Sequence, residues 1–162
     1  MKNKVLDSFD DAVNDIKDGA SIMLGGFATP GTPRNLIKAL LRKGTKGITL
    51  IANSPGGRDN VIDASTLIKA GLVDKMICSF TASPHPSVVT PFDELYQNGE
   101  IEAELVPQGT LAERIRAAGA GIGAFYTRSS AETDLAVGKE QRLIDGKEYV
   151  LEYPLPADYA LI

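Results

Sequence analysis

Short apolar runs alternate with amphipathic stretches along most of this 162-residue chain, and this alternation limits its fold more than any other feature. The clearest amphipathic stretch follows residue 33, where apolar residues recur at helical spacing, namely Leu36, Ile37, Leu40 and Leu41. Strand, helix and strand in this order indicate a parallel sheet flanked by helices. We therefore predict an α/β fold of the open, doubly wound type, with strands at residues 21–24, 48–51, 75–80 and 101–106.

Helix starts are marked by hydroxyl residues that precede an acid or a proline. The hydroxyl accepts a hydrogen bond from a free amide of the first turn, while the acid favours the helix dipole and the proline presets the backbone. Three starts are predicted in this way: Ser8 with Asp11, Thr32 as N-cap with Pro33 at the next position, and a capping box of Thr110 with Glu113 for a helix through about Ala118.

The last third of the chain has a different texture. Three glycines are predicted to end the last helix: Gly119, Gly121 and Gly123. Asp145-Gly146 is a two-residue turn signal between residues 142–144 and 147–153, and it predicts a short β-hairpin near the C-terminus. Residues 158–162 are typical of one more strand, and because a buried strand is rarely a free terminus, we expect truncation at this end. The predicted organisation is a single domain, 1–162.

Composition excludes several classes of protein. The net charge is −4, and the 17 Lys and Arg residues are spread along the chain without the basic stripe of a nucleic-acid binder. No segment approaches the roughly 18 apolar residues of a membrane span. The single cysteine, Cys78, is typical of a reducing cytoplasm, and its apolar neighbours predict a buried, inert thiol. No Cys/His cluster indicates a metal site.

Three predicted strand ends carry glycine or amide groups. The first strand runs into Gly25 and Gly26, and a loop through Gly31 leads to the next helix, whose first amides favour an anion. Asn53 follows the second strand, and Gln108 stands between the fourth strand and the following helix. Because ligands of open α/β sheets bind at the carboxyl ends of the strands, we expect a binding site at this edge.

Each candidate also has a purely structural alternative. The glycine loop serves equally well as a tight turn, and its spacing matches neither the dinucleotide-binding nor the P-loop motif. Gln108 equally well braces its own turn. The coincidence of three such strand ends favours a binding role more than any one motif does.

Two longer motifs resemble family I coenzyme A transferases. Gly25-Gly26-Phe27, with Gly31 and Pro33, is similar to the G-G-F-x-x-x-G-x-P motif of their A subunits, and residues 107–117 are similar to the block P-Q-G-[TN]-L-A-E-R-I-R-A. The resemblance covers essentially the whole chain and is nearest the succinyl-CoA:3-oxoacid and 3-oxoadipate branches. Two places depart from the family pattern: Ser54 replaces an asparagine, and residues 128–133 replace a glycine-rich segment.

The resemblance implies an A subunit that is active only with a B subunit, in a heterodimer or heterotetramer. Such enzymes move CoA from an acyl-CoA, such as succinyl-CoA or acetyl-CoA, to a carboxylic acid, here a 3-oxo acid, through a glutamyl-CoA thioester. The glutamate belongs to an S-E-N-G context that this chain lacks, so the nucleophile is expected on the partner. Glu113 is assigned to its capping box instead.

By match to the family, CoA and substrate contacts are expected at Gly25, Gly26, Phe27, Ala28, Thr29, Pro30, Gly31, Asn53 and Gln108. Coenzyme A is then a substrate, and neither a cofactor nor a metal is implied. The expected partners are the B subunit, an acyl-CoA and a carboxylic acid, without nucleic acid or membrane. The alternative is a non-catalytic module that binds acyl-CoA or an anion.

Overall fold

The computed structural model describes residues 3–27, 29–58, 60–81, 85 and 87–162. The chain forms two compact units, each described here by itself. The first unit contains residues 1–104 and 157–162, and the second contains residues 105–156. The single domain over 1–162 stays a prediction.

The first unit is built on a five-stranded sheet with the order β4-β3-β2-β1-β8. Strand β1 pairs in parallel with β2 on one side and with β8 on the other, and β2 pairs in parallel with β3. This parallel sheet confirms the predicted α/β class. Its strands are β1 (Ser21–Leu24), β2 (Ile48–Ile51), β3 (Val73–Cys78), β4 (Glu102–Leu105) and β8 (Tyr159–Leu161).

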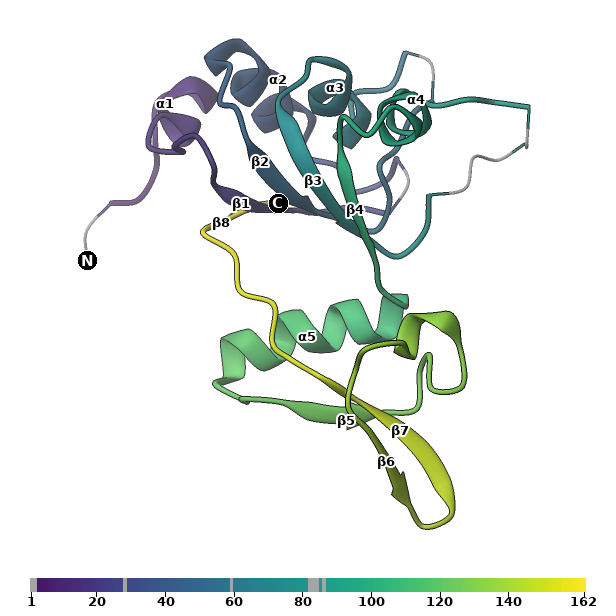
Figure 1. Ribbon diagram of the computed structural model, residues 1–162. Helices are drawn as coiled ribbons and strands as arrows, with labels where there is room; N and C mark the ends of the chain where they lie inside the picture. Colours follow the sequence, from purple (N-terminus) through teal and green to yellow (C-terminus); the bar gives the residue numbers. More distant parts are fainter. Residues whose placement is uncertain (1–2, 28, 59, 82–84, 86) are drawn as a thin grey trace. The chain divides into compact units, whose positions relative to one another are not determined.

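Four helices lie on one face of this sheet (Figure 1). The connections from β1 to β2, β3 and β4 step in one direction, and right-handed crossovers that step one way place their helices on the same face. Strand side chains such as Ile22, Leu50 and Met76 are fully buried in the resulting core, together with Leu40 and Leu67 of the helices. The helices are α1 (Phe9–Val13), α2 (Arg34–Lys43), α3 (Ala64–Lys69) and α4 (Pro91–Gln97).

Of the two helix starts predicted in the first unit, one is confirmed and the other is wrong by one position. Ser8 caps α1 as predicted, since its hydroxyl accepts a hydrogen bond of 3.0 Å from the amide of Asp11. The start at Thr32 is one position too early, because Pro33 has a non-helical ψ of 69° and itself occupies the N-cap position of α2. The Arg34 amide instead closes a short turn to the Thr32 carbonyl.

The second unit packs one long helix with a small antiparallel sheet. Its strand order is β5-β7-β6, with α5 (Gln108–Ala120), β5 (Phe125–Thr127), the 3-10 turn η1 (Asp134–Ala136), β6 (Gln141–Ile144) and β7 (Lys147–Glu152). The predicted hairpin is confirmed. Asp145 and Gly146, with φ of 49° and 72°, form its turn, as a two-residue turn with both central residues left-handed requires.

The predicted capping box of α5 is wrong. The helix begins at Gln108, because the Leu111 amide already donates to the Pro107 carbonyl at 2.8 Å. Thr110 therefore lies inside the first turn, where its side chain is buried, and Glu113 forms an ion pair with Arg116 at 2.6 Å.

The predicted end of α5 is also too early. The helix continues through Gly119 to Ala120 and ends at Gly121, whose φ of 69° gives the left-handed cap that glycine adopts without strain. Only one of the three glycines therefore terminates the helix.

Cys78 is fully buried at the end of β3, as predicted. Burial raises the pKa of its thiol from 9.0 to about 11, since the thiolate is poorly solvated there. At pH 8 the folded chain should therefore react with iodoacetamide about 10²-fold more slowly than the urea-unfolded chain. Mass spectrometry of the alkylated chain measures both rates, and equal rates would contradict a protected thiol.

Candidate substrate site

The loop between β1 and α2 is a tight turn. The Phe27 amide donates to the Pro30 carbonyl at 3.0 Å, and Gly26 has a φ of 105°. A Cβ atom at Gly26 would lie 2.9 Å from the backbone nitrogen of Thr32, so no larger residue fits. The loop begins beside β8, where the Gly25 amide donates to the Leu161 carbonyl at 2.9 Å. The turn itself thus requires its glycine, whatever ligand it meets.

Asn53 links the ends of three strands. Its side-chain amide donates to the Gly26 carbonyl at 2.8 Å, and its own carbonyl accepts from the Ser79 amide beyond β3 at 3.0 Å. The structure therefore brings Asn53 and the glycine loop together, as the shared sheet edge predicts. This contact gives Asn53 a definite task, which is to hold the loop after β1 against the end of β2.

The other predicted contacts divide between the two units. Phe27 and Thr29 line a cavity of the first unit. Ala28 lies outside the described residues. Gln108 belongs to the second unit, as the exposed first residue of α5. Beside it, a Cβ atom at Gly109 would meet no atom within 4 Å, so the backbone at this helix start is open to approach.

A cavity of about 1230 Å³ lies at the loops that follow β1, β2 and β3. Phe27 and Phe80, from two of these loops, form its aromatic pair with ring centroids 5.9 Å apart. Ser54 lines it too, at a place where the chain departs from the family pattern. A concave, partly apolar space with a few polar groups is the usual form of a small-molecule site.

Several cavity residues escaped the sequence reasoning. Arg58, Phe80, Val88 and Val89 all line the cavity, yet none belongs to the motifs that carry the resemblance. A signal was available, because Phe80 is the last residue of the predicted strand 75–80 and Arg58 follows the predicted strand 48–51, as Asn53 does. Arg58 lies five residues beyond Asn53 on the same loop.

The cavity wall depends on two further glycines. Gly56 and Gly57 have φ of 72° and 118°. A Cβ atom at Gly56 would lie 2.4 Å from the carboxylate of Asp63, and one at Gly57 would lie 2.7 Å from the side chain of Thr90. Asp63 is itself buried and accepts from the amides of Gly57 and Ser65. The loop after β2 is therefore fixed against the first turns of α3 and α4.

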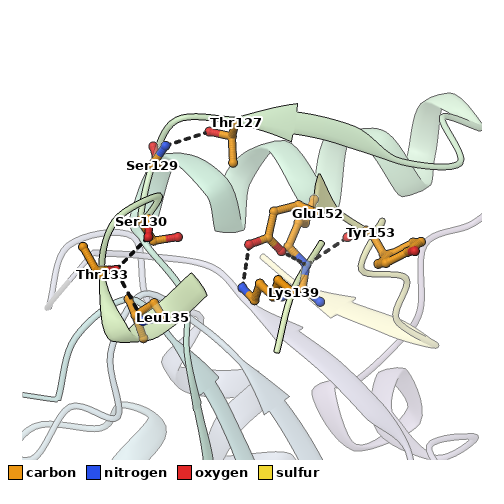
Figure 2. A network of polar contacts seen from close by, with 9 residues as sticks. Thr127, Ser129, Ser130, Thr133, Leu135, Lys139, Glu152 and Tyr153 are labelled. Carbon is orange, nitrogen blue, oxygen red and sulfur yellow. Dashed lines mark hydrogen bonds and ion pairs between the residues drawn. The ribbon is translucent and has the colours of Figure 1, made fainter. Parts of the chain in front are cut away.

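In the second unit, a buried carboxylate, that of Glu152 in β7, contacts Arg114 of α5 and Lys139, and Figure 2 shows its contact with Lys139. Glu152 is only 3% exposed, and its Oε1 lies 2.6 Å from the ammonium of Lys139. Its Oε2 lies 3.9 Å from Nε of Arg114, which also donates to the Tyr153 carbonyl at 2.9 Å. The Leu155 amide in turn donates to the Arg114 carbonyl. These contacts fix the helix on which Gln108 is the first residue.

Sequence patterns gave no sign of this cluster. Its residues, Arg114, Lys139 and Glu152, are 13 or more positions apart in the chain, and each is of a type that is usually exposed.

Glu113, which was assigned to a capping box, forms an ion pair with Arg116 at the surface of α5. The hydrogen bond from Arg116 holds the pKa of Glu113 below its usual value. Among the residues that the structure describes, no group of three His, Cys, Asp or Glu side chains is placed to hold a metal ion. Within the same residues, no helix has both the length and the apolar character to cross a membrane.

The first unit is an α/β fold with a glycine turn and a cavity of about 1230 Å³ at the carboxyl edge of its parallel sheet, where proteins of this class have room for a small ligand. The sequence profile of the family described as Coenzyme A transferase matches residues 6–162. The chain belongs to the coenzyme A transferase family, which confirms the resemblance.

Individual relatives agree with this assignment. The chain is 51% identical over all 162 residues to the A subunit of 3-oxoadipate CoA-transferase from Pseudomonas putida, 68% of which it covers. It is 40% identical over 160 residues, 99% of its length, to the A subunit of succinyl-CoA:3-ketoacid coenzyme A transferase from Helicobacter pylori J99, covering 66% of that protein. It thus spans about two thirds of the length of the curated relatives it matches. Both predicted branches are represented.

A solved structure supports the fold. Glutaconate coenzyme A-transferase from Acidaminococcus fermentans superimposes with a TM-score of 0.74 over 98% of this chain and 55% of that one, at 22% identity.

Proposed function

We propose that this chain is the A subunit of a CoA-transferase that moves CoA from an acyl-CoA to a carboxylic acid, a 3-oxo acid being the expected acceptor. The observation that carries the proposal is the 51% identity, over the whole chain, to an A subunit named for such an activity. The cavity beside the glycine turn supports it, since it offers room for an acyl group next to the predicted CoA contacts.

The reaction needs a nucleophile that the partner supplies. A glutamate carboxylate of that partner, the B subunit, attacks the thioester and releases the CoA thiolate, leaving an acyl-glutamyl anhydride. The thiolate then attacks the glutamyl carbonyl of the anhydride, which forms the glutamyl-CoA thioester and frees the first carboxylic acid. The acceptor carboxylate takes CoA by the reverse sequence. Each step exchanges one acyl bond for another, so a difficult transfer is divided into easier ones.

The part of this chain in the reaction is to bind and orient. Residues 25–31 would contact CoA, and Asn53 holds that loop through its bond to the Gly26 carbonyl. Gln108 would donate to the negative charge that develops on an attacked carbonyl. We infer that CoA is a substrate and that the reaction uses no cofactor. We also infer that the chain assembles with a B subunit into a heterodimer or heterotetramer. A cytoplasmic location stays a prediction from the single cysteine.

The purified chain alone should give no CoA transfer, and the chain coexpressed with a B subunit that contains S-E-N-G should give turnover. The test follows CoA transfer from succinyl-CoA or acetyl-CoA to a series of carboxylic acids. Turnover by the chain alone would contradict the proposal, because another residue would then carry the covalent intermediate.

The alternative, a binding module without catalysis, predicts a different experimental result. It requires acyl-CoA or an anion to bind to the chain while no complex with a B subunit turns over. Native mass spectrometry of the chain purified from its own cell separates the two, because a copurifying B subunit favours the enzyme.

A further inference from the structure

A small cavity of about 20 Å³ lies between the glycine turn after β1 and the loop after β2. Ser54, Gly56 and Asp63 line both this space and the cavity of about 1230 Å³, so the small cavity adjoins the larger one. A space of this size has room for about one water molecule. Its polar side chains come from Thr32, Asn53, Ser54 and Asp63.

The walls of the small cavity are held by contacts within the chain. On one side, the Asn53 side chain donates to the Gly26 carbonyl at 2.8 Å and holds the glycine turn. On the other side, Gly56 approaches the Asp63 carboxylate so closely that a Cβ atom would lie 2.4 Å from it. Both walls are therefore fixed. A fixed space lined by polar groups binds water, whereas cavities that stay dry are apolar.

The Asp63 carboxylate has capacity for a further hydrogen bond. Its Oδ1 accepts from the Ser65 amide at 2.9 Å and from the Ser65 hydroxyl at 2.6 Å. Among the residues that the structure describes, its Oδ2 accepts only from the Gly57 amide, and this bond is long, at 3.3 Å. A carboxylate accepts up to about four hydrogen bonds, and Asp63 is only 5% exposed. Because buried polar atoms are normally hydrogen-bonded, a donor is expected at Oδ2.

Ser54 is a position at which the chain departs from the family pattern, which has an asparagine there. An asparagine side chain is larger than that of serine and ends in an amide that both donates and accepts. The exchange therefore removes volume and a donor at the place where the small cavity lies. The Ser54 hydroxyl makes no hydrogen bond to the residues that the structure describes, so it is available to a water molecule.

We propose that the small cavity is a binding site for one ordered water molecule, which takes the place of the family's asparagine amide. The water donates to Oδ2 of Asp63 and shares a hydrogen bond with the Ser54 hydroxyl. Thr32 and Asn53 offer further polar atoms on the side of the glycine turn. The water thereby joins the turn after β1 to the loop after β2, within the wall of the larger cavity. This site is independent of the proposed CoA transfer.

A high-resolution crystal structure of the chain tests the site directly. We expect a density peak in the small cavity, with distances of about 2.7–3.2 Å to oxygen atoms of Asp63 and Ser54. A small cavity without such a peak would overturn the proposal. A peak surrounded by several oxygen atoms at about 2.4 Å would also overturn it, since distances this short indicate a metal cation.

Ser54→Asn supplies the amide in place of the water. Its crystal structure should show the amide in the small cavity and no water, and magnetic relaxation dispersion of the water oxygen should detect fewer long-lived internal waters than in the wild type. The melting temperature should rise by about 2–4 °C, because an ordered water is released while Asp63 keeps a donor. An asparagine that turns into the larger cavity, with the water still bound, would contradict the exchange of water for amide.

Ser54→Leu is the matched control, because leucine fills a space similar to that of asparagine but has neither donor nor acceptor. It should expel the water as well, yet the melting temperature should fall by about 5 °C, since the buried Asp63 carboxylate loses its donor. Equal shifts of the melting temperature in Ser54→Asn and Ser54→Leu would count against a hydrogen bond from the water to Asp63. None of these measurements uses CoA transfer, so their outcome is separate from that of the proposed function.

Discussion

Gln108→Ala, in the complex with the B subunit, should lower kcat by roughly 10²-fold, with a smaller change in KM. Gln108 is the exposed first residue of a 13-residue helix, where the helix dipole adds partial positive charge. A neutral amide donates to a developing oxyanion without holding a ground-state carboxylate tightly, so its loss raises mainly the barrier. Steady-state kinetics of the variant complex measure the effect.

Two matched variants distinguish catalysis from bracing of the turn. Gln108→Glu keeps the shape of the side chain but loses the donor, so it should be as slow as the alanine variant. Gly109→Ala adds a methyl group that meets no atom within 4 Å outside the neighbouring residues and the nearby backbone of its own helix, and it should raise the free energy of unfolding by about 0.5 kcal/mol. If it also lowers turnover, a ligand approaches this backbone. A lower melting temperature of Gln108→Ala with unchanged kcat would contradict the catalytic role.

Lys139→Met should lower the free energy of unfolding by about 3 kcal/mol, because it removes the closest partner of a buried carboxylate. The Lys139 ammonium lies 2.6 Å from Glu152, which is 3% exposed. Urea unfolding followed by circular dichroism measures the loss.

An exposed ion pair of the same length provides the control. Arg116 and Glu113 are also 2.6 Å apart, but both are accessible to water, so Arg116→Met should cost less than about 1 kcal/mol. The double variant Lys139→Met with Glu152→Met should recover part of the loss, since the buried carboxylate is then absent and Arg114 keeps its hydrogen bond to the Tyr153 carbonyl. Equal effects of Lys139→Met and Arg116→Met would contradict the importance of burial.

The sequence was sufficient where a pattern has one physical meaning. The runs at 21–24 and 48–51 are strands with the predicted bounds, because short apolar runs before glycine or asparagine fit little else in a parallel sheet. Asp145-Gly146 is equally restricted, since few residue pairs adopt two successive left-handed conformations. These features placed the glycine turn and Asn53 at one edge.

The sequence was insufficient where two patterns overlap. Thr110 and Glu113 fit a capping box, yet Pro107 three residues earlier starts the helix first. The short helix α3, which Asp63 caps, was missed, because its six residues span less than two turns and give little periodicity. Because α3 was not predicted, the wall of the cavity was not predicted either: Asp63, which caps α3, fixes the loop on which Arg58 lies. Local motifs thus predicted the glycine turn after β1. The cavity wall formed by the loop after β2 depends on contacts between distant residues, which local motifs do not indicate.

The pairing of β1 with β8 has a consequence for synthesis of the chain. Ser21 and Asp158, which join these strands, are 137 residues apart, and the whole second unit is translated between them. Contacts of such long sequence separation form slowly. The strands β2, β3 and β4 leave the ribosome long before β8, so one edge of β1 stays without its neighbour while the rest of the sheet is ready to pair. The Gly25 amide, which donates to the Leu161 carbonyl, gains its partner last, and until then the nascent edge is open to strands of other chains.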